Sequence, residues 1–238
     1  MSTATDYHPN MVILGHTVHA SWYAITRLGE AGIALPVALA LGVWLLISAR
    51  SVRLASSWFV PLALAVGLTT ISKVAFLGWG IGIASIDFTG FSGHAMFAAA
   101  VYPMLAYAMT HHLRERSHPG AHALGLIASY GLAALIAVSR VKIGAHSVSE
   151  AAAGFALGAA ASGSALWLTE NARHRVPGIW LCLGMAGWLA AMPAYAAPSI
   201  THSLVTRLAL KLSQRSVPYQ RADLHRAARG KAPSEIAR

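Results

Sequence analysis

The sequence of 238 residues has little cysteine and little charge. Its single cysteine, Cys182, cannot form an intramolecular disulfide, which excludes a small secreted fold stapled by such bonds. Only 11% of the residues are charged and 56% are hydrophobic. A soluble globular domain has about 25% charged residues, and a disordered chain is poorer in apolar residues. The composition therefore predicts an integral membrane protein.

Acidic residues are also scarce, with 8 Asp and Glu against 18 Lys and Arg, so the formal net charge is +10. A basic protein can bind nucleic acid or anionic lipid, and the position of the charges distinguishes the two. A basic tail beside apolar segments favours the lipid surface, so we expect no nucleic-acid partner. Eight of the basic residues follow position 200: Arg207, Lys211, Arg215, Arg221, Arg226, Arg229, Lys231 and Arg238.

Long apolar runs dominate the middle of the chain, and a helix needs about 20 such residues to cross a bilayer. Short connections between them predict one all-α fold, a polytopic membrane helix bundle of about six transmembrane helices. The runs are 31–49, 58–80, 93–110, 122–141, 147–169 and 177–196.

The runs also suggest a division of the chain. Residues 1–30 form an N-terminal segment, with an expected interfacial helix over 11–28, and residues 31–196 form the six-span domain. Because the first basic residue is Arg27, no cleavable secretory signal is expected. Residues 197–238 form a basic tail, in which leucines at helical spacing predict an amphipathic helix on the membrane, whereas the polar stretch 218–238 is expected to be loosely ordered.

Two polar segments at the ends of apolar runs are candidates for a site, because polar groups at membrane depth are costly and usually functional. The hairpin of the third and fourth runs places both at the same end of the bundle. In the second segment, 139–150, Arg140 can grip phosphate oxygens, Lys142 adds charge and His146 is a candidate nucleophile. Glu150 follows His146 by four residues, where it can orient the imidazole on a helix.

The first segment supplies a complementary group. Ser92 is placed to cap a helix that begins at Gly93, whose free N–H groups favour an anion, and His94 can donate a proton. Ser147 and Glu150 also match the capping-box pattern, so Glu150 has a structural explanation beside the catalytic one.

These segments resemble the motifs of a known family. Phe91-Ser92-Gly93-His94 resembles the Pro-Ser-Gly-His motif, and 139–150 resembles the Ser-Arg-x5-His-x3-Asp motif, of the type 2 phosphatidic-acid phosphatase superfamily. That superfamily includes lipid phosphatases and vanadium haloperoxidases. The resemblance implies an acid-phosphatase-like helical core and hydrolysis of a phosphomonoester or diphosphate through a phosphohistidine, with no metal and no cofactor.

The resemblance also assigns roles. His146 attacks phosphorus, His94 protonates the leaving oxygen and Glu150 orients His146. The groups that would hold the phosphoryl oxygens are Arg140, Ser92, Gly93, Ser139, Lys73 and Lys142.

The sequence departs from the family pattern in three places. The family's first motif is Lys-x6-Arg-Pro, but Lys73 is followed by Gly80 and Ile81, so the Arg-Pro half is missing and Lys142 is the candidate replacement for its charge. Phe91 stands where the family has proline, and Glu150 is one methylene longer than the family's aspartate.

Three functions remain open on these grounds. The leading hypothesis is a membrane phosphatase for a lipid phosphate or an isoprenoid diphosphate. The missing Arg-Pro favours its rival, a non-catalytic phospholipid-binding or transport protein that retains the fold. A haloperoxidase is disfavoured because the likeness to those enzymes stops at the motifs. A separate metal site at the other end of the bundle is disfavoured, because its four histidines have no paired carboxylate pattern and no fixed spacing: His111, His112, His118 and His122.

The orientation in the membrane follows from the short connections opposite the expected site. Their basic pairs are typical of a cytoplasmic face, which predicts a bacterial inner-membrane protein with its site on the periplasmic side. The same number of spans places the basic tail on the periplasmic side as well. Long tails can translocate largely regardless of charge, so the short connections decide the prediction. The pairs are Arg50 and Arg53, Arg114 and Arg116, and Arg173 and Arg175.

Overall fold

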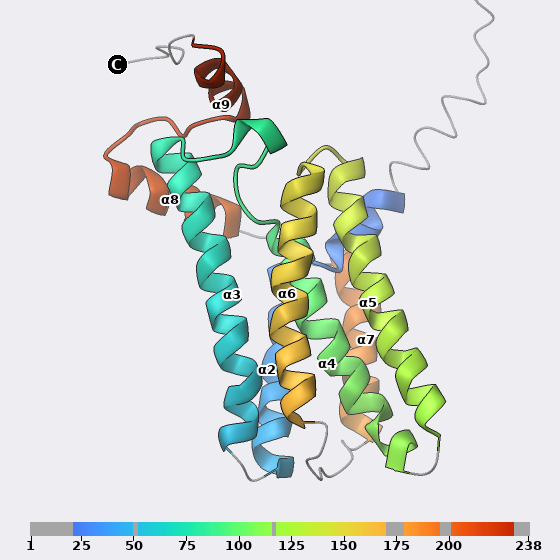
Figure 1. The fold of residues 1–238 in the computed structure, drawn as a ribbon. Helices are drawn as coiled ribbons and strands as arrows, with labels where there is room; N and C mark the ends of the chain where they lie inside the picture. Colours follow the sequence, from blue (N-terminus) through green and yellow to red (C-terminus); the bar gives the residue numbers. More distant parts are fainter. Residues whose placement is uncertain (1–20, 50–51, 116–117, 170–178, 196–200, 231–238) are drawn as a thin grey trace, which may run out of the picture.

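The computed structural model describes residues 21–49, 52–115, 118–169, 179–195 and 201–230, and the described part of the chain is helical without a β-strand ladder. This confirms the expected all-α bundle (Figure 1). The named elements are α2 (Ala31–Ala49), α3 (Val52–Trp79), η1 (Ala84–Ile86), α4 (Gly93–Glu115), α5 (Pro119–Lys142), α6 (Val148–Thr169), α7 (Ile179–Tyr195), α8 (Thr201–Ser213) and α9 (Arg221–Ala228).

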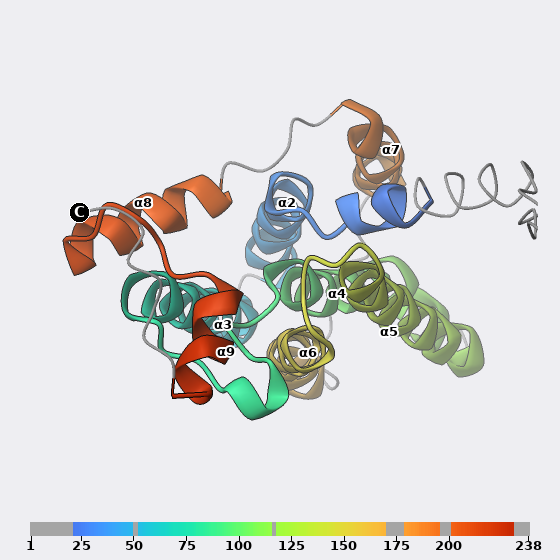
Figure 2. The same cartoon turned by 90° about the horizontal axis from the view of Figure 1, so that it is seen from above.

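Each of the six apolar runs corresponds to one helix, from α2 to α7. Four segments in the described chain are long and apolar enough to cross a membrane: Ser21–Ile47, Ala55–Trp79, Pro119–Lys142 and Val148–Leu168. Helix α4 is instead the central helix, packed among α2, α3, α5 and α6 (Figure 2). Its residues from Ala95 to Leu105 are all buried, which makes α4 the core of the bundle.

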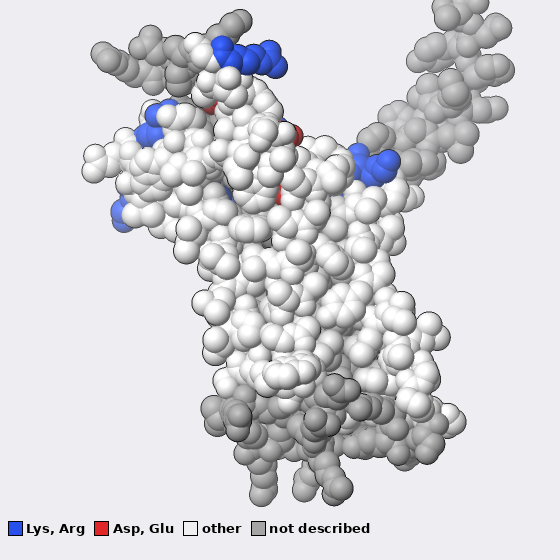
Figure 3. Space-filling view, viewed as in Figure 1, with Lys and Arg blue, Asp and Glu red and all other residues white. Residues whose placement is uncertain are grey.

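The outer surface of the bundle is apolar. Large hydrophobic side chains such as Leu39, Leu64 and Ile127 are more than 60% exposed. On the face shown in Figure 3, the middle of the bundle carries no charged atoms, and the blue and red atoms gather at the end near α9. A soluble protein rarely exposes so much apolar surface, so this belt is the surface that faces lipid.

Two glycines allow α6 to approach α4 closely. A Cβ at Gly154 would lie 2.4 Å from the carbonyl oxygen of Ser92, and one at Gly158 would lie 2.1 Å from that of Met96. Small residues at such spacing let two helices approach closely. The contact holds the first turn of α4 against the first three turns of α6, beside the two candidate segments.

The C-terminal tail differs from the sequence-based expectation. Helix α8 lies across α3, as expected of an amphipathic helix, with Leu204, Leu208 and Leu212 exposed (Figures 1 and 2). The stretch after Val217, expected to be loosely ordered, contains helix α9 and a capping box between Gln220 and Asp223. At the other terminus, residues 21–27 are helical, and residues 11–20 of the expected interfacial helix lie outside the described residues.

Candidate functional site

A cavity of about 640 Å³ lies at the end of the bundle where the α3–α4 and α5–α6 connections meet. Its wall includes six of the nine predicted site residues: Lys73, Gly93, His94, Arg140, His146 and Glu150. They come from α3, α4, α5, the α5–α6 turn and α6. The expected convergence of the two polar segments is therefore present in the fold.

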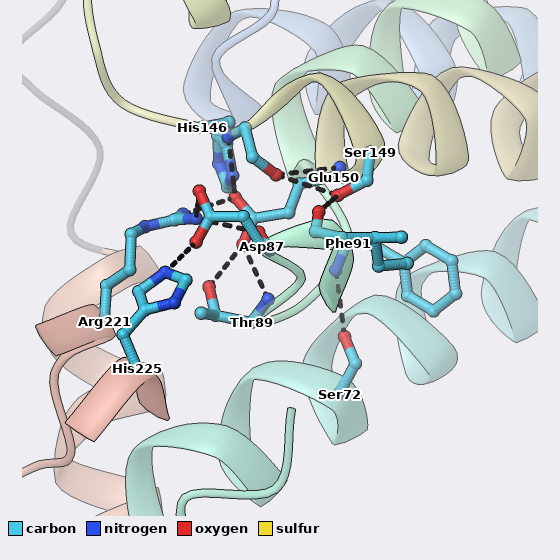
Figure 4. A network of polar contacts seen from close by, with 11 residues as sticks. Ser72, Asp87, Thr89, Phe91, His146, Ser149, Glu150, Arg221 and His225 are labelled. Carbon is cyan, nitrogen blue, oxygen red and sulfur yellow. Dashed lines mark hydrogen bonds and ion pairs between the residues drawn. The ribbon is translucent and has the colours of Figure 1, made fainter. Parts of the chain in front are cut away.

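The centre of the site is a histidine–carboxylate pair. His146 Nδ1 lies 2.8 Å from Glu150 Oε2, and the side chains of the two residues are 12% and 0% exposed (Figure 4). An ionised carboxylate can only accept hydrogen bonds, so Nδ1 carries the proton. In neutral His146 the proton-free nitrogen is then Nε2, and its lone pair is available for attack.

Glu150 is held by backbone groups as well. Ser147 N–H donates to Glu150 Oε2 at 3.1 Å and Ser147 Oγ accepts from Glu150 N–H at 3.3 Å, so the predicted capping box is present. Thr89 donates to Oε1 through its N–H at 2.7 Å and through its hydroxyl. The α3–α4 connection is thus tied to the start of α6, and Phe91 N–H ties it to Ser72 of α3 (Figure 4).

The charge state of His146 is set mainly by burial. Desolvation lowers the pKa of His146 below its ordinary value, while the hydrogen bond to Glu150 opposes this and the positive charges of Lys73 and Arg140 add to it. His146 is therefore neutral at neutral pH, which is the form that a nucleophile needs.

Arg140 and His94 are braced by the segment before α2. Arg140 Nη1 donates to the buried Thr26 Oγ1 at 3.0 Å. A Cβ at Gly29 would lie 2.9 Å from both the Cβ and the carbonyl oxygen of His94, so the chain passes directly over that residue. The N-terminal segment therefore forms part of the site wall, which sequence reasoning did not reveal.

Buried donors near the cavity have no partner in the described protein. They are Arg140 Nε, Thr69 Oγ1 and Ser92 Oγ. Unpaired buried polar atoms are costly, and an anionic ligand would satisfy them. Ser92 directly precedes α4 and its carbonyl accepts from Met96 N–H, but its hydroxyl makes no capping bond there.

Three predicted phosphate ligands do not line the cavity: Ser92, Ser139 and Lys142. Ser139 is fully buried and its hydroxyl donates to the carbonyl of Ile136 in its own helix at 2.6 Å. Lys142 is exposed at the end of α5. The candidate replacement of the missing motif charge by Lys142 gains no support from this geometry.

Sequence reasoning missed Arg221, which α9 brings to the cavity wall. Its guanidinium bonds Glu150 Oε2 at 2.8 Å, Asp87 Oδ2 at 2.6 Å and the Asp87 carbonyl at 2.8 Å (Figure 4). The hydrogen bond from Arg221 holds the pKa of Asp87 below its ordinary value, and His225, 2.8 Å from Asp87 Oδ1, acts in the same direction. A single arginine in a polar tail gives no sequence signal of this role.

Residue 80, where the family motif has arginine, is a glycine that contacts the C-terminal tail. Gly80 has φ of 72°, and a Cβ there would lie 3.1 Å from the Tyr219 ring. Tyr219 lies two residues before Arg221 in the chain, and its N–H donates to the Leu77 carbonyl at 2.9 Å. The absence of a side chain at residue 80 therefore allows the tail to reach the site.

The histidines at the opposite end of the bundle pack together. His111 and His122 are buried beside Tyr107, and Thr110 Oγ1 lies 2.8 Å from His122 Nδ1. Among the described residues, no group of three or more His, Cys, Asp or Glu side chains is arranged to hold a metal ion.

Comparison with known proteins agrees with the motifs. Residues 84–175 match the model of the PAP2 superfamily. An uncharacterized 22.5 kDa protein in the cps region of Klebsiella pneumoniae is 35% identical over 215 residues, which cover 87% of this chain and 99% of that protein. Phosphatidylglycerophosphatase B of Bacillus subtilis is 40% identical over 67 residues, 28% of this chain and 32% of that protein.

A solved structure shares the fold. The crystal structure of a transmembrane PAP2 type phosphatidylglycerolphosphate phosphatase from Bacillus subtilis matches with a TM-score of 0.50 and 23% identity, covering 71% of this chain and 81% of that one. The apolar helices and this shared fold define an all-α integral membrane protein. The chain belongs to the PAP2 superfamily.

Proposed function

We propose that the protein is a membrane phosphatase that hydrolyses a lipid phosphate or an isoprenoid diphosphate through a phosphohistidine at His146. The observation that carries this proposal is the His146–Glu150 pair, in which the proton of the neutral imidazole lies on Nδ1 and Nε2 is free to attack. Two cationic side chains, Lys73 and Arg140, line the same cavity. A metal-free attack on phosphorus needs such a nucleophile and such charges.

The proposed reaction has two steps. His146 Nε2 forms a bond to phosphorus while the bond from phosphorus to the leaving oxygen breaks, and His94, which has to enter this step as the imidazolium, gives that oxygen its proton. Water then attacks phosphorus, His94 takes a proton from the water, and inorganic phosphate leaves as the bond to His146 breaks. Glu150 fixes the tautomer of His146 and stabilises its cationic form in both steps.

Phosphate binding is assigned chiefly to four groups. Arg140 and Lys73 supply positive charge at the cavity wall, and Gly93 opens α4, whose first N–H groups favour an anion. The buried Ser92 hydroxyl is a fourth donor without a partner among the described residues. The roles of Ser139 and Lys142 remain predictions from the resemblance alone.

A lipid substrate is favoured by the walls of the cavity. Beside the polar groups, the lining includes Leu35, Val66, Phe76 and Phe97 from α2, α3 and α4. These side chains offer an apolar path from the phosphate site toward the lipid-facing surface. A headgroup at the polar end and an acyl or prenyl chain along the apolar wall fit this division.

Release of inorganic phosphate tests the proposal. Purified protein in detergent is offered phosphatidate, phosphatidylglycerol phosphate and undecaprenyl diphosphate. We expect turnover of at least one of these and its loss in the His146→Ala variant. Folded wild-type protein that releases no phosphate from any of them would contradict the proposal.

A periplasmic site in a bacterial inner membrane is the proposed orientation. It rests on the ends of α2, α4 and α6, which lie at the end of the bundle opposite the cavity (Figure 1), and on the three pairs of arginines that the sequence carries near these helix ends.

A further inference from the structure

Hydrogen-bond donors surround the Glu150 carboxylate, and one of them, Arg221, is a permanent cation that lies outside the family motifs. The carboxylate is 0% exposed and accepts from Thr89, Ser147, His146 and Arg221. Within the described chain, Arg221 is the only Lys or Arg side chain that hydrogen-bonds to Glu150. Both Arg221 and His146 contact the same oxygen, Oε2, at 2.8 Å.

A buried carboxylate is stable only when a positive charge balances it. Two groups in contact with Oε2 can supply that charge, the guanidinium of Arg221 and a protonated His146. An imidazole that takes up the proton loses the lone pair on Nε2 and cannot attack phosphorus. The source of the balancing charge therefore affects how readily His146 takes up a proton and loses its reactivity.

We infer that Arg221 is a positioning residue that keeps His146 in its neutral, nucleophilic form by balancing the charge of Glu150. This inference rests on the proposed function, because it concerns the reactivity of the same histidine. The C-terminal helix α9 is then a working part of the site and not only a cover over it.

The other charged groups around His146 do not replace Arg221 in this role. The other titratable side chains that line the cavity with His146 and Glu150 are Lys73 of α3, Arg140 of α5, His94 of α4, His202 of α8 and Glu30 before α2. Lys73 and Arg140 also disfavour a proton on His146 through their charge. The Arg140 guanidinium donates a hydrogen bond to Thr26, and the positive charge in direct contact with Glu150 Oε2 is that of Arg221.

Helix α9 is anchored well enough to hold the guanidinium in place. Leu224 is 9% exposed and packs against the loop at Gly82, where an added Cβ would lie 3.2 Å from its methyl carbons. Asp87, in the left-handed conformation with φ of 53°, binds both Arg221 and His225. The Tyr219 ring on Gly80 provides a third anchor.

The test compares Arg221→Gln with Arg226→Gln, which removes the same charge from the same helix. Arg226 is 47% exposed and pairs with Asp223 at 3.7 Å. The pKa of His146 is measured by NMR of histidine-labelled protein in detergent, with the His146 signal assigned by its loss in His146→Ala. We expect Arg221→Gln to raise this pKa by about one unit or more, as removal of a contacting charge does, and Arg226→Gln to leave it unchanged.

Activity supplies a second measure. In Arg221→Gln the acid limb of the kcat/KM profile should move to higher pH. On that limb kcat/KM should fall about tenfold for each unit by which the His146 pKa rises, and it should recover at alkaline pH. Arg221→Lys keeps the charge and should restore most of the wild-type profile. A purely structural role for Arg221 would instead lower activity equally at every pH.

An unchanged His146 pKa in folded Arg221→Gln, or an equal change in Arg226→Gln, would overturn the inference. If Arg221→Gln does not fold, Leu224→Ser serves instead, because it loosens α9 through its apolar anchor and should also raise the His146 pKa. An inactive wild-type protein would refute the proposed function, yet the NMR titration would still decide the role of Arg221.

Discussion

At the scale of single residues, Glu150 combines two roles that the sequence presented as alternatives. Its Oε2 accepts from the Ser147 N–H of the capping box and from His146 Nδ1. The cap fixes the carboxylate at the start of α6, and the fixed carboxylate orients the histidine four residues earlier. The structural explanation of Glu150 thus supports the proposed catalytic one.

Substitution of Glu150 by Gln separates the two roles. The amide of Glu150→Gln can keep the hydrogen bond from Ser147, but its NH₂ group then faces the donors of Thr89 or Arg221. We therefore expect the free energy of unfolding to fall by about 1–3 kcal/mol and Tm to fall by no more than about 10 °C. Turnover should fall at least about a hundredfold, because the charge that stabilises cationic His146 is gone. Thermal unfolding and phosphate release measure the two effects.

Glu150→Asp is the matched control, because it keeps the charge and shortens the side chain by one methylene. It should retain more turnover than Glu150→Gln. Wild-type turnover in a folded Glu150→Gln protein would leave Glu150 as a helix cap alone.

At the scale of elements, the apolar helices could be predicted and the tail helix could not. Long apolar runs allow few alternatives to helix in a membrane, so α2 to α7 follow from the sequence. Helix α9 has eight residues, too few to be stable in isolation, and it depends on tertiary contacts of Leu224 and Arg221. Gln220 and Asp223 form the capping box at its start.

The same distinction applies to the parts of the site. His146 and Glu150 lie four residues apart, so their contact is local and could be predicted, although His146 lies in the turn before α6 and not on that helix. Arg221 is 71 residues from Glu150, and Thr26 is 114 residues from Arg140, so neither contact leaves a trace in local spacing. Ser139 matches the motif, yet its hydroxyl bonds the backbone of its own helix.

At the scale of the whole molecule, the two ends of the bundle differ. The cavity, α8 and α9 lie at one end, and α2, α4 and α6 end at the other (Figure 1), where the neighbouring sequence carries the arginine pairs. The exposed leucines of α8 favour a position at the membrane surface on the side of the site. A lipid headgroup would then enter the cavity from the same layer in which α8 lies.

Cysteine labelling tests this orientation. In a variant with Cys182→Ser, a cysteine at Ser117, in the α4–α5 connection, should resist an impermeant maleimide in intact cells and react after permeabilisation. A cysteine at the exposed Ser216, after α8, should react in intact cells and is the matched control. Labelling of residue 117 from outside would invert the proposed topology.

The central claim is that His146 becomes covalently phosphorylated during turnover. Wild-type protein is mixed with a ³²P-labelled lipid phosphate, quenched in alkali, where phosphohistidine survives, and analysed by mass spectrometry of its peptides. The account predicts acid-labile phosphate on His146 that is absent from His146→Ala and increased when the second step is slowed at low temperature. Phosphate release by wild-type protein without any label on His146 would contradict the mechanism, and binding of the lipid without release or label would leave a phospholipid-binding protein.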